Sequence, residues 1–329
     1  KTVLITGGTG SFGKGFIRTI LKNHRPKRLV VFSRDELKQY ELAKEIPESK
    51  FSCIRYFLGD VRDRDRLIRA LSGIDVVVHA AAMKHVPAAE YNPTECIATN
   101  IIGAQNIIDA AIINKVKLVI ALSTDKAANP INLYGASKLC SDKLFIAANN
   151  LSGKHKTRFS IVRYGNVLGS RGSVIPLFKN LLSKGKNKLP ITDIEMTRFV
   201  ITLQAGVNFV IKSIKEMRGG EIFIPKIKSI KIIDLIECMA GKDNYHIIGI
   251  RPGEKLHEVM LPKEESANCI ELKDYFVIPP LFSWWNMATI NKKVLKVGKR
   301  VSKDFEYSSS NKNLIMSKMD IKQLLREYE

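Results

Sequence analysis

The stretch Thr2-Val3-Leu4-Ile5-Thr6-Gly7-Gly8-Thr9-Gly10-Ser11-Phe12-Gly13 decides the fold of this chain. Its first apolar residues are typical of a buried parallel strand, and residues 16–21 carry the apolar spacing of a helix. Glycine lets the backbone between them turn tightly and approach a pyrophosphate, whose charge the free N–H groups of the helix then meet. We therefore predict a dinucleotide site, with an ordinary strand-to-helix turn as the alternative. Its candidate contacts are Gly7, Thr9, Gly10, Ser11, Phe12 and Gly13.

Apolar runs and helical periods alternate along the rest of the first half. Strands are predicted at 29–33, 51–58, 76–79, 118–123 and 159–164, and helices at 63–71, 101–113 and 133–147. This alternation indicates an α/β fold, a Rossmann-like doubly wound parallel sheet over residues 1–165. Glycine and proline become frequent afterwards, which predicts a smaller α/β substrate-binding lobe over 166–329. Parts of about 199–226 are expected to pack back on the first domain.

Length, cysteines and charge limit the class of protein. The 329 residues can bury a substantial core, and without a long apolar run or a signal sequence we expect a cytoplasmic protein with no membrane partner. The five cysteines are widely spaced and form no CxxC pair, which argues against a disulfide framework and a metal site. The net charge of +21 could mark a nucleic-acid binder. However, the basic residues are spread throughout and their densest cluster lacks interleaved aromatics, so no nucleic-acid partner is expected.

The stretch Ser123-Thr124-Asp125-Lys126 follows a predicted strand and precedes a predicted helix with Tyr134 and Lys138. Tyr134 and Lys138 are four residues apart and so share one helix face. An adjacent ammonium favours the phenolate of a tyrosine that normally titrates near ~10, which makes the pair a candidate base. Asp125 and Lys126 are a candidate acid and base, with a solvated ion pair worth about 0–1 kcal/mol as the alternative. Pro130 is predicted to begin the next helix, where its missing N–H has no cost.

The end of the second strand bears on the choice between NAD and NADP. Ser33 and Arg34 can hold a 2′-phosphate, whereas NAD enzymes usually place an acid there for the ribose, so NADP is predicted. Two alternatives stay open, because Ser33 and Glu36 have the spacing of a capping box and Asp35 could bind the ribose. The further candidate cofactor contacts are Lys38, Asp60, Val61, Ala80, Ala81, Lys84, Ser123, Tyr134 and Lys138.

Several motifs together resemble one family along almost the entire chain. They are the glycine turn, Ser123-Thr124-Asp125-Lys126, Tyr134-Gly135-Ala136-Ser137-Lys138, Arg163-Tyr164-Gly165-Asn166, Met196-Thr197-Arg198-Phe199, Arg251-Pro252-Gly253-Glu254-Lys255-Leu256-His257-Glu258 and Asp304-Phe305-Glu306-Tyr307-Ser308-Ser309. The chain thus resembles the extended short-chain dehydrogenases/reductases and, within them, the inverting UDP-N-acetylglucosamine 4,6-dehydratases. Retaining relatives have glutamate in the place of Lys126, which favours inversion at C5. Only residues 284–301 match nothing in that family.

The resemblance implies a reaction and a role for each candidate. NADP-dependent dehydration of UDP-N-acetylglucosamine gives UDP-2-acetamido-2,6-dideoxy-β-L-arabino-hex-4-ulose, the first step of pseudaminic-acid-type sugar synthesis. Tyr134, assisted by Lys138 and Thr124, takes the proton of the 4-hydroxyl; Lys126 removes the C5 proton; Asp125 protonates the departing 6-hydroxyl. The implied substrate contacts are Lys84, Asn166, Arg171, Arg198, Arg251 and Glu254, and two guanidiniums suit one diphosphate. A homo-oligomer is also implied, with a hexamer as one form.

Three alternatives remain. A retaining dehydratase or a nucleotide-sugar epimerase has the same fold, but epimerases hold NAD and need no acid-base pair such as Asp125-Lys126. A catalytically silent dinucleotide-sensing protein is also compatible with the fold, although such proteins tend to lose the tyrosine or the lysine, and both are intact here. Nucleic-acid binding is supported by charge alone.

Overall fold

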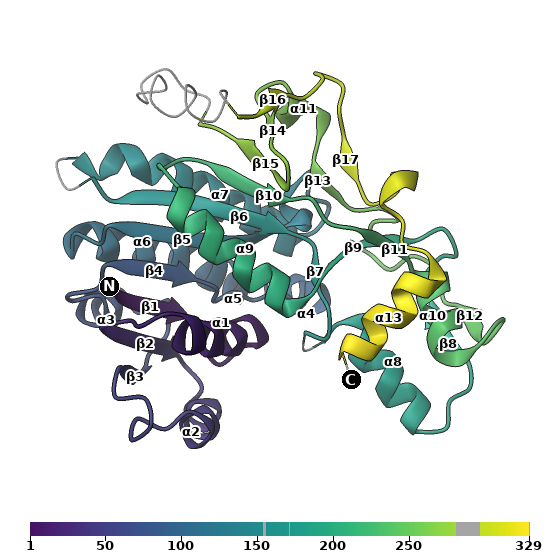
Figure 1. Cartoon of the computed structure of the whole chain (residues 1–329), viewed down its shortest axis with the longest axis horizontal. Helices are drawn as coiled ribbons and strands as arrows, with labels where there is room; N and C mark the ends of the chain where they lie inside the picture. The colour runs from purple at the N-terminus through teal and green to yellow at the C-terminus, as the bar shows by residue number, and fades with distance from the viewer. Residues whose placement is uncertain (154–155, 171, 281–296, 329) are drawn as a thin grey trace.

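The computed structural model describes residues 1–153, 156–170, 172–280 and 297–328, and these residues form two lobes (Figure 1). The larger lobe is built on a ten-stranded sheet of order β16-β14-β15-β10-β6-β5-β4-β1-β2-β3 within the described residues. Its strands are β1 (Thr2–Thr6), β2 (Arg28–Ser33), β3 (Ile54–Leu58), β4 (Val76–His79), β5 (Leu118–Thr124), β6 (Arg158–Tyr164), β10 (Ile222–Pro225), β14 (Ile270–Glu271), β15 (Tyr275–Ile278) and β16 (Lys299–Arg300). Neighbours from β3 to β10 are parallel, and β15, β14 and β16 extend the edge antiparallel. The predicted doubly wound α/β fold is confirmed.

Helices cover both faces of this sheet, because successive strand residues point to opposite sides. Leu4 of β1 packs in one core and its neighbours Val3 and Ile5 in the other. The first core is closed by α3 (Arg64–Ala70), α6 (Gly103–Ile113) and α7 (Leu133–Leu151), the second by α1 (Ser11–Asn23), α2 (Glu36–Glu45) and α9 (Leu203–Glu216). The sheet is therefore buried on both faces, as its apolar strands require.

One helical run has the length and hydropathy of a membrane span. It comprises α5 (Pro93–Ile97), the π-helix η1 (Ala98–Ile102) and α6, and follows α4 (Val86–Tyr91). However, 56% of its most apolar window is buried, and it packs against α3 and α7. Burial of this kind is typical of a core helix of the larger lobe.

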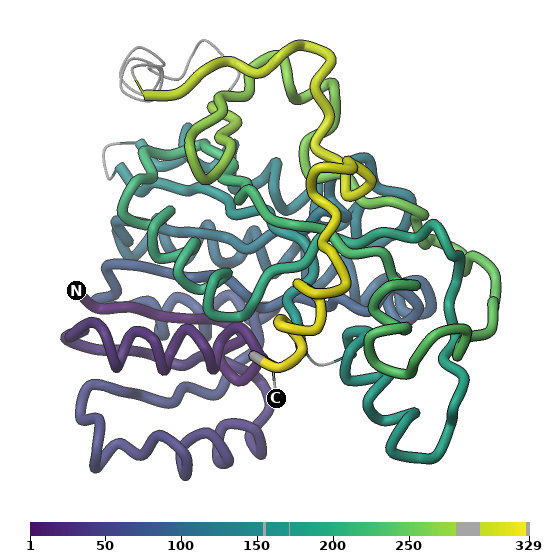
Figure 2. The backbone as a smooth tube through the Cα atoms, turned by 45° about the vertical axis from the view of Figure 1, so that its right-hand side comes forward, coloured from purple at the N-terminus to yellow at the C-terminus, as the bar shows by residue number. Residues whose placement is uncertain are grey.

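The smaller lobe has its own apolar core around α8, α10 and α13. Its elements are β7 (Asn166–Val167), α8 (Val174–Ser183), β8 (Leu189–Ile191), β9 (Thr197–Ile201), β11 (Ser229–Lys231), α10 (Ile232–Ala240), β12 (Tyr245–Ile247), η4 (Lys312–Leu314) and α13 (Lys318–Tyr328). By contrast, β13 (Val259–Leu261), α11 (Lys263–Ser266) and β17 (Tyr307–Ser308) lie against the larger lobe, since Met260, Leu261 and Tyr307 pack in its core. The chain crosses between the lobes several times, since α9, β10, β14, β15 and β16 lie with the large sheet while α13 packs against α10 (Figure 2). The division at residue 165 stays a prediction.

Most predicted boundaries agree with the structure to within one or two residues, and larger differences occur at the third strand and at α7. The third strand begins at Ile54 rather than at residue 51, because the N–H of Phe51 bonds the Pro47 carbonyl in a turn. Helix α7 begins at Leu133, as its apolar spacing predicted, and continues to Leu151 rather than ending at 147, whereas the prediction that Pro130 begins it was wrong. The Asn132 side chain caps α7 by accepting from the Gly135 N–H at 2.8 Å, and Pro130 lies in the preceding loop.

Candidate active site

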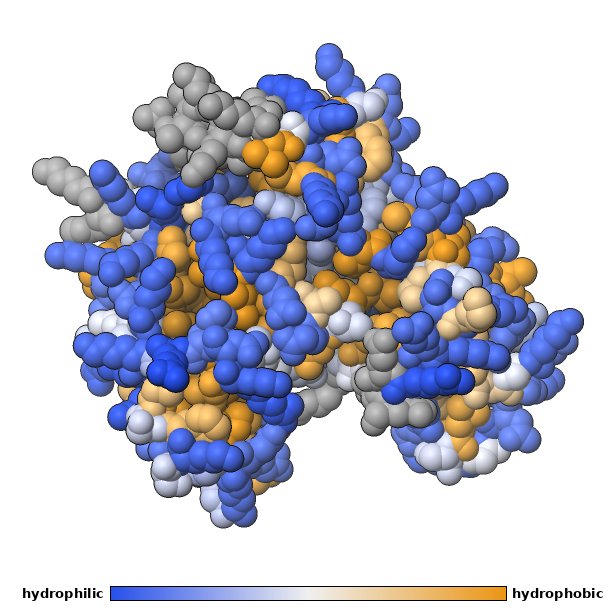
Figure 3. All heavy atoms as spheres, in the orientation of Figure 1, coloured by the Kyte–Doolittle hydropathy of each residue, from blue (hydrophilic) through white to orange (hydrophobic). Residues whose placement is uncertain are grey.

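A cleft of about 980 Å³ opens at the carboxyl ends of the parallel strands, between the lobes. Figure 3 shows a notch between two lower parts of the molecule under a largely hydrophilic surface. Ligands of open α/β sheets bind at this edge. The structure brings to it Gly7, Thr9, Gly10, Ser11, Phe12, Gly13, Ser33, Arg34, Asp35, Lys38, Asp60, Val61, Ala80, Ala81, Lys84, Ser123, Thr124, Lys126, Tyr134, Lys138, Asn166, Arg198, Arg251 and Glu254. Asp125 does not line the cleft, and Arg171 lies outside the described residues.

The glycine turn presents the start of α1 to this cleft. Gly10 is the N-cap residue, no side chain caps the helix, and its first turn holds no acidic residue. A Cβ on Gly13 would lie 2.4 Å from the Gly8 carbonyl oxygen, so only glycine lets α1 pack this closely on the turn. Uncapped N–H groups at a positive helix end suit an anion, and the turn fits the pyrophosphate of a dinucleotide.

The end of β2 is held by contacts within a few residues. The Gln39 amide donates to the Ser33 Oγ at 3.0 Å, so Ser33 is not a helix cap. Asp35 is the N-cap of α2, accepts from the Lys38 N–H at 2.9 Å and pairs with the Lys38 ammonium. The capping box of Ser33 and Glu36 was therefore wrong, because the helix begins one residue after Asp35.

Arg34 and Asp60 approach each other across the ends of β2 and β3. The Arg34 side chain is 64% exposed, and its Nη1 lies 3.7 Å from Asp60 Oδ2. Burial opposes the charge of Asp60, but hydrogen bonds from Arg62 outweigh it and lower the pKa of Asp60. Arg34 thus keeps an exposed guanidinium at the cleft, where a phosphate could bind.

The carboxyl end of β5 carries the candidate catalytic residues. Ser123 and Thr124 lie beside Arg163 and Tyr164 of β6 in parallel register. A single 3₁₀ turn, η2 (Asp125–Ala127), follows β5. A Cβ on Gly135 would lie 2.2 Å from the Lys126 carbonyl oxygen, so glycine at this position brings α7 directly against η2. The short loop thereby places Lys126 and Tyr134 at the same cleft.

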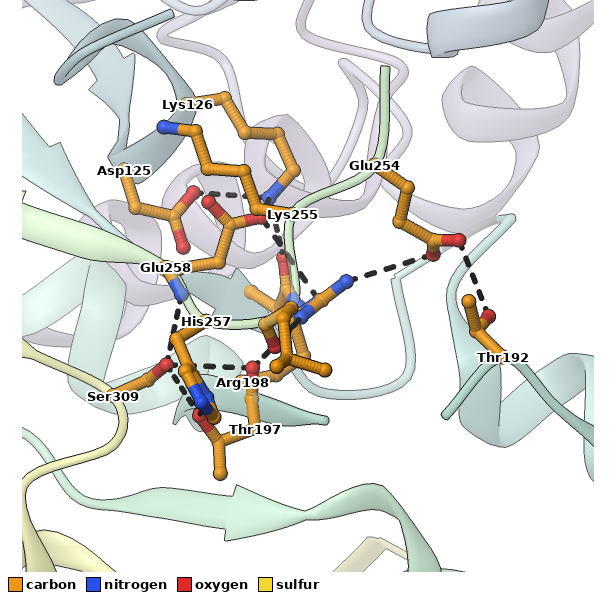
Figure 4. Close-up of polar contacts among 12 residues, drawn as sticks. Asp125, Lys126, Thr192, Thr197, Arg198, Glu254, Lys255, His257, Glu258 and Ser309 are labelled. Atoms are coloured by element: carbon orange, nitrogen blue, oxygen red, sulfur yellow. Dashed lines mark hydrogen bonds and ion pairs between the residues drawn. The ribbon is translucent and has the colours of Figure 1, made fainter. Parts of the chain in front are cut away.

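Lys126 lies between two buried carboxylates (Figure 4). Its Nζ is 3.0 Å from Asp125 Oδ1 and 3.2 Å from Glu258 Oε1, and donates to Asn166 Oδ1 at 3.4 Å. Burial would lower the pKa of Lys126, but Asp125 and Glu258 outweigh it, so the pKa is raised. Asp125 is fully buried, unlike the predicted alternative of a solvated ion pair, and accepts from the Thr124 hydroxyl at 2.9 Å.

Burial has the largest effect on the pKa values of Tyr134 and Lys138. Burial raises the pKa of Tyr134 to about 12, against the Lys126 ammonium and a Thr124 hydrogen bond. Lys126 therefore favours the phenolate of Tyr134, and the assistance of Lys138 stays a prediction. Burial lowers the pKa of Lys138, with Asp142 acting in the opposite direction.

Asp142 belongs to a buried charge network that the sequence analysis missed. It accepts from the Ser123 hydroxyl at 2.7 Å and lies 3.9 Å from Arg163 Nη2. Arg163, buried itself, donates to Glu265 Oε2 at 2.5 Å. The spacing in the sequence could have indicated Asp142 as a member of the site, because it is four residues after Lys138 and so lies on the same helix face.

Residues 251–258 bring further charges to the cleft. Glu254 Oε1 lies 2.9 Å from Arg251 and 3.5 Å from Arg198, so one carboxylate holds both guanidiniums. Burial opposes the charge of Glu254, but Arg251 and Arg198 lower its pKa. Glu258 belongs to the same segment, and the motif that contains it did not predict a role for it.

Comparisons with known proteins agree with this arrangement. Residues 3–280 match the family described as polysaccharide biosynthesis protein. The UDP-N-acetylglucosamine 4,6-dehydratase (inverting) of Campylobacter jejuni subsp. jejuni serotype O:2 is 53% identical over 332 residues, covering 100% of this chain and 98% of the relative. A UDP-glucose 4-epimerase of Rickettsia bellii is 44% identical, covering 85% of this chain and 83% of that protein.

Solved structures give the same picture. The protein Pen of Bacillus thuringiensis has a TM-score of 0.88 and 41% identity, covering 100% of this chain and 98% of its own. A dTDP-glucose 4,6-dehydratase of Streptomyces venezuelae, solved with NAD bound, has a TM-score of 0.68 and 23% identity, covering 78% of this chain and 87% of its own. A dinucleotide cofactor is typical of such relatives, and the glycine turn fits one. The chain belongs to the polysaccharide biosynthesis protein family of extended short-chain dehydrogenases/reductases.

Proposed function

We propose that this protein is an NADP-dependent UDP-N-acetylglucosamine 4,6-dehydratase that inverts C5. The proposal rests mainly on the Asp125–Lys126 pair at the end of β5, which is held close to Tyr134 at the cleft. Full-length similarity to the Campylobacter jejuni inverting dehydratase supports the same substrate and outcome. The exposed guanidinium of Arg34 favours NADP over NAD. We also propose that the protein is a homo-oligomer, as the resemblance implies. Light scattering, which measures the molar mass in solution, tests this.

The chemistry that NADP supplies when bound is removal of hydride from C4 and its return to C6. Tyr134 takes the proton of the 4-hydroxyl while Thr124 bonds the same oxygen. Burial raises the pKa of Tyr134 to about 12 even though Lys126 and Thr124 favour the phenolate. The phenol therefore holds its own proton at neutral pH, and a further cation has to favour the phenolate before Tyr134 acts as base.

Oxidation at C4 makes the C5 proton acidic, and Lys126 is the cleft-lining group that removes it. Asp125 is fully buried and contacts Lys126, so the proton for the departing 6-hydroxyl comes through the Asp125–Lys126 pair. Arg198 and Arg251, held by Glu254, bind the diphosphate.

The decisive experiment is turnover of UDP-N-acetylglucosamine in heavy water with the products followed by NMR. We expect a 4-keto-6-deoxy product deuterated at C5 with the L-arabino configuration, and no net accumulation of reduced nicotinamide. An early product of D-xylo configuration would move the chain to the retaining dehydratases. A C4 epimer formed without loss of water would make it an epimerase, and no turnover would favour a binding protein.

A further inference from the structure

Glu258 is a buried acid that reaches the catalytic lysine from a segment far along the chain. It is 2% exposed, immediately precedes β13, and its Oε1 lies 3.2 Å from Lys126 Nζ. Its backbone is fixed by Ser309 on both sides, since the Ser309 Oγ accepts from the Glu258 N–H at 2.9 Å and the Ser309 N–H donates to the Glu258 carbonyl at 2.8 Å. The backbone that carries this carboxylate is therefore anchored.

Each of the two carboxylates on Lys126 has one oxygen without a partner. Glu258 Oε2 and Asp125 Oδ2 are buried and have no hydrogen-bond partner among the described residues. An unpartnered buried acceptor costs about 1–3 kcal/mol, and folded proteins retain such atoms mainly where they have a function.

Two carboxylates and two cations meet around Lys126. The ionisable groups that act on Lys126 are Asp125 of η2, Glu258 and Arg198 of β9; Lys126 in turn acts on Tyr134 of α7, and Lys255 interacts with Asp125, Glu258 and Lys126. Both carboxylates pair with the Lys126 ammonium, as Figure 4 shows, and Glu258 Oε1 also lies 3.9 Å from Arg198 Nε. Asp125 is the neighbour of Lys126 in the chain and also accepts from Thr124, whereas Glu258 belongs to a segment far along the chain.

The segment that carries Glu258 also carries the proposed diphosphate contacts. Arg251 and Glu254 lie at one end of it and Glu258 at the other. In between, the Gly253 carbonyl accepts from Asn132 at 2.7 Å, and Lys255 donates to the Ala128 carbonyl at 2.8 Å. Binding of the diphosphate therefore bears directly on the segment that positions Lys126.

We propose that Glu258 is a positioning residue for the dehydration, which holds the Lys126 side chain toward the sugar through its ion pair. This inference rests on the proposed function. Glu258 forms and breaks no covalent bond in the reaction; it acts only through the place and the charge of the Lys126 amine.

The test compares Glu258→Gln, Lys126→Met and the double variant in the full-length enzyme with NADP and UDP-N-acetylglucosamine. We expect Glu258→Gln to lower kcat about 10²-fold with little change in KM. The double variant should be no slower than Lys126→Met alone, since Glu258 acts through Lys126. Glu258→Asp, which keeps the charge, should restore part of the rate.

A matched control is Glu221→Gln, which changes another buried carboxylate, one that accepts from Ser160 and the Gly219 N–H in the large lobe. It should lower the melting temperature without a change in the pH profile of kcat. In Glu258→Gln the Lys126 amine, followed by NMR of labelled lysine without substrate, should titrate at lower pH than in the wild type.

The outcomes separate this proposal from the proposed function. If the wild type forms no dehydrated product, both are overturned. If the wild type dehydrates the sugar but the two substitutions act additively, or Lys126 titrates unchanged in Glu258→Gln, the role of Glu258 alone is overturned. Should Glu258→Gln fold poorly, the double variant, which removes both members of the pair, and Glu258→Asp still decide the question.

Discussion

The two halves of the cleft are held by contacts of very different range. In the cofactor half, Asp35 binds Lys38 and Gln39 binds Ser33, partners three and six residues away. In the substrate half, Lys126 reaches Asn166, 40 residues away, and Asn132 reaches Gly253, 121 residues away. The contacts that hold the end of β2 are thus local, whereas those around Lys126 and Asn132 also join segments far apart in the chain. A substitution in the first half should affect one ligand contact, and one in the second should affect chemistry and stability together.

The strongest test of this difference is Lys126→Met. Dehydration should fall by at least ~10²-fold, as expected on loss of a general base. Stability should also fall, by about 3–5 kcal/mol, because Asp125 remains as a buried carboxylate without its cation and Glu258 keeps only Arg198, at 3.9 Å. Turnover and thermal melting measure the two effects. A variant with near wild-type activity would break the comparison and make Lys84 the next candidate base.

The same difference in range explains what the sequence could predict. Strands such as β4 and the glycine turn were predicted correctly, because apolar period and turn chemistry are local. The apolar spacing predicted the start of α7 at residue 133. The prediction that Pro130 begins it was wrong, because Pro130 and Asn132 are both common near helix starts and only the side-chain hydrogen bond distinguishes them. The charge of Lys126 could not be predicted, since it depends on Glu258, which comes from a segment far along the chain.

The second prediction concerns the cofactor half. Arg34→Ala should weaken NADP binding about 10–100-fold, the value of one charge-assisted contact, and leave NAD binding nearly unchanged. The Arg34 side chain is 64% exposed, so its loss should hardly affect stability. Calorimetric titration with both dinucleotides measures this ratio. Equal weakening for NAD and NADP would show that Arg34 does not select the cofactor.

The third prediction concerns the pKa of Lys138, which lies where the cofactor half and the substrate half of the cleft meet. Burial lowers the pKa of Lys138 and the Asp142 carboxylate opposes this, so Asp142→Asn should lower the pKa further. Lys138 would then lose its proton at lower pH, and the alkaline fall of kcat/KM should move to lower pH, with about tenfold lower activity at neutral pH. Ser123→Ala removes a hydrogen bond to the same carboxylate but no charge, and should leave the position of that fall unchanged. If the alkaline limb of the kcat/KM profile does not move in Asp142→Asn, Asp142 does not control the pKa of Lys138.

The smallest effect is expected at Asp35, where two roles compete. The structure has Asp35 as the cap of α2, and the sequence also allowed it as a ribose contact. If capping is its role, Asp35→Ala should cost about 1 kcal/mol of stability and change the affinity for both dinucleotides little. Asp35→Asn keeps a capping side chain without its charge and should be nearly as stable as the wild type. Thermal melting together with NAD and NADP titrations separates the roles, because a ribose contact would instead weaken NAD binding in both variants. That result would place a ligand contact on a residue already engaged by its own helix, and the cofactor half would then be as interdependent as the substrate half.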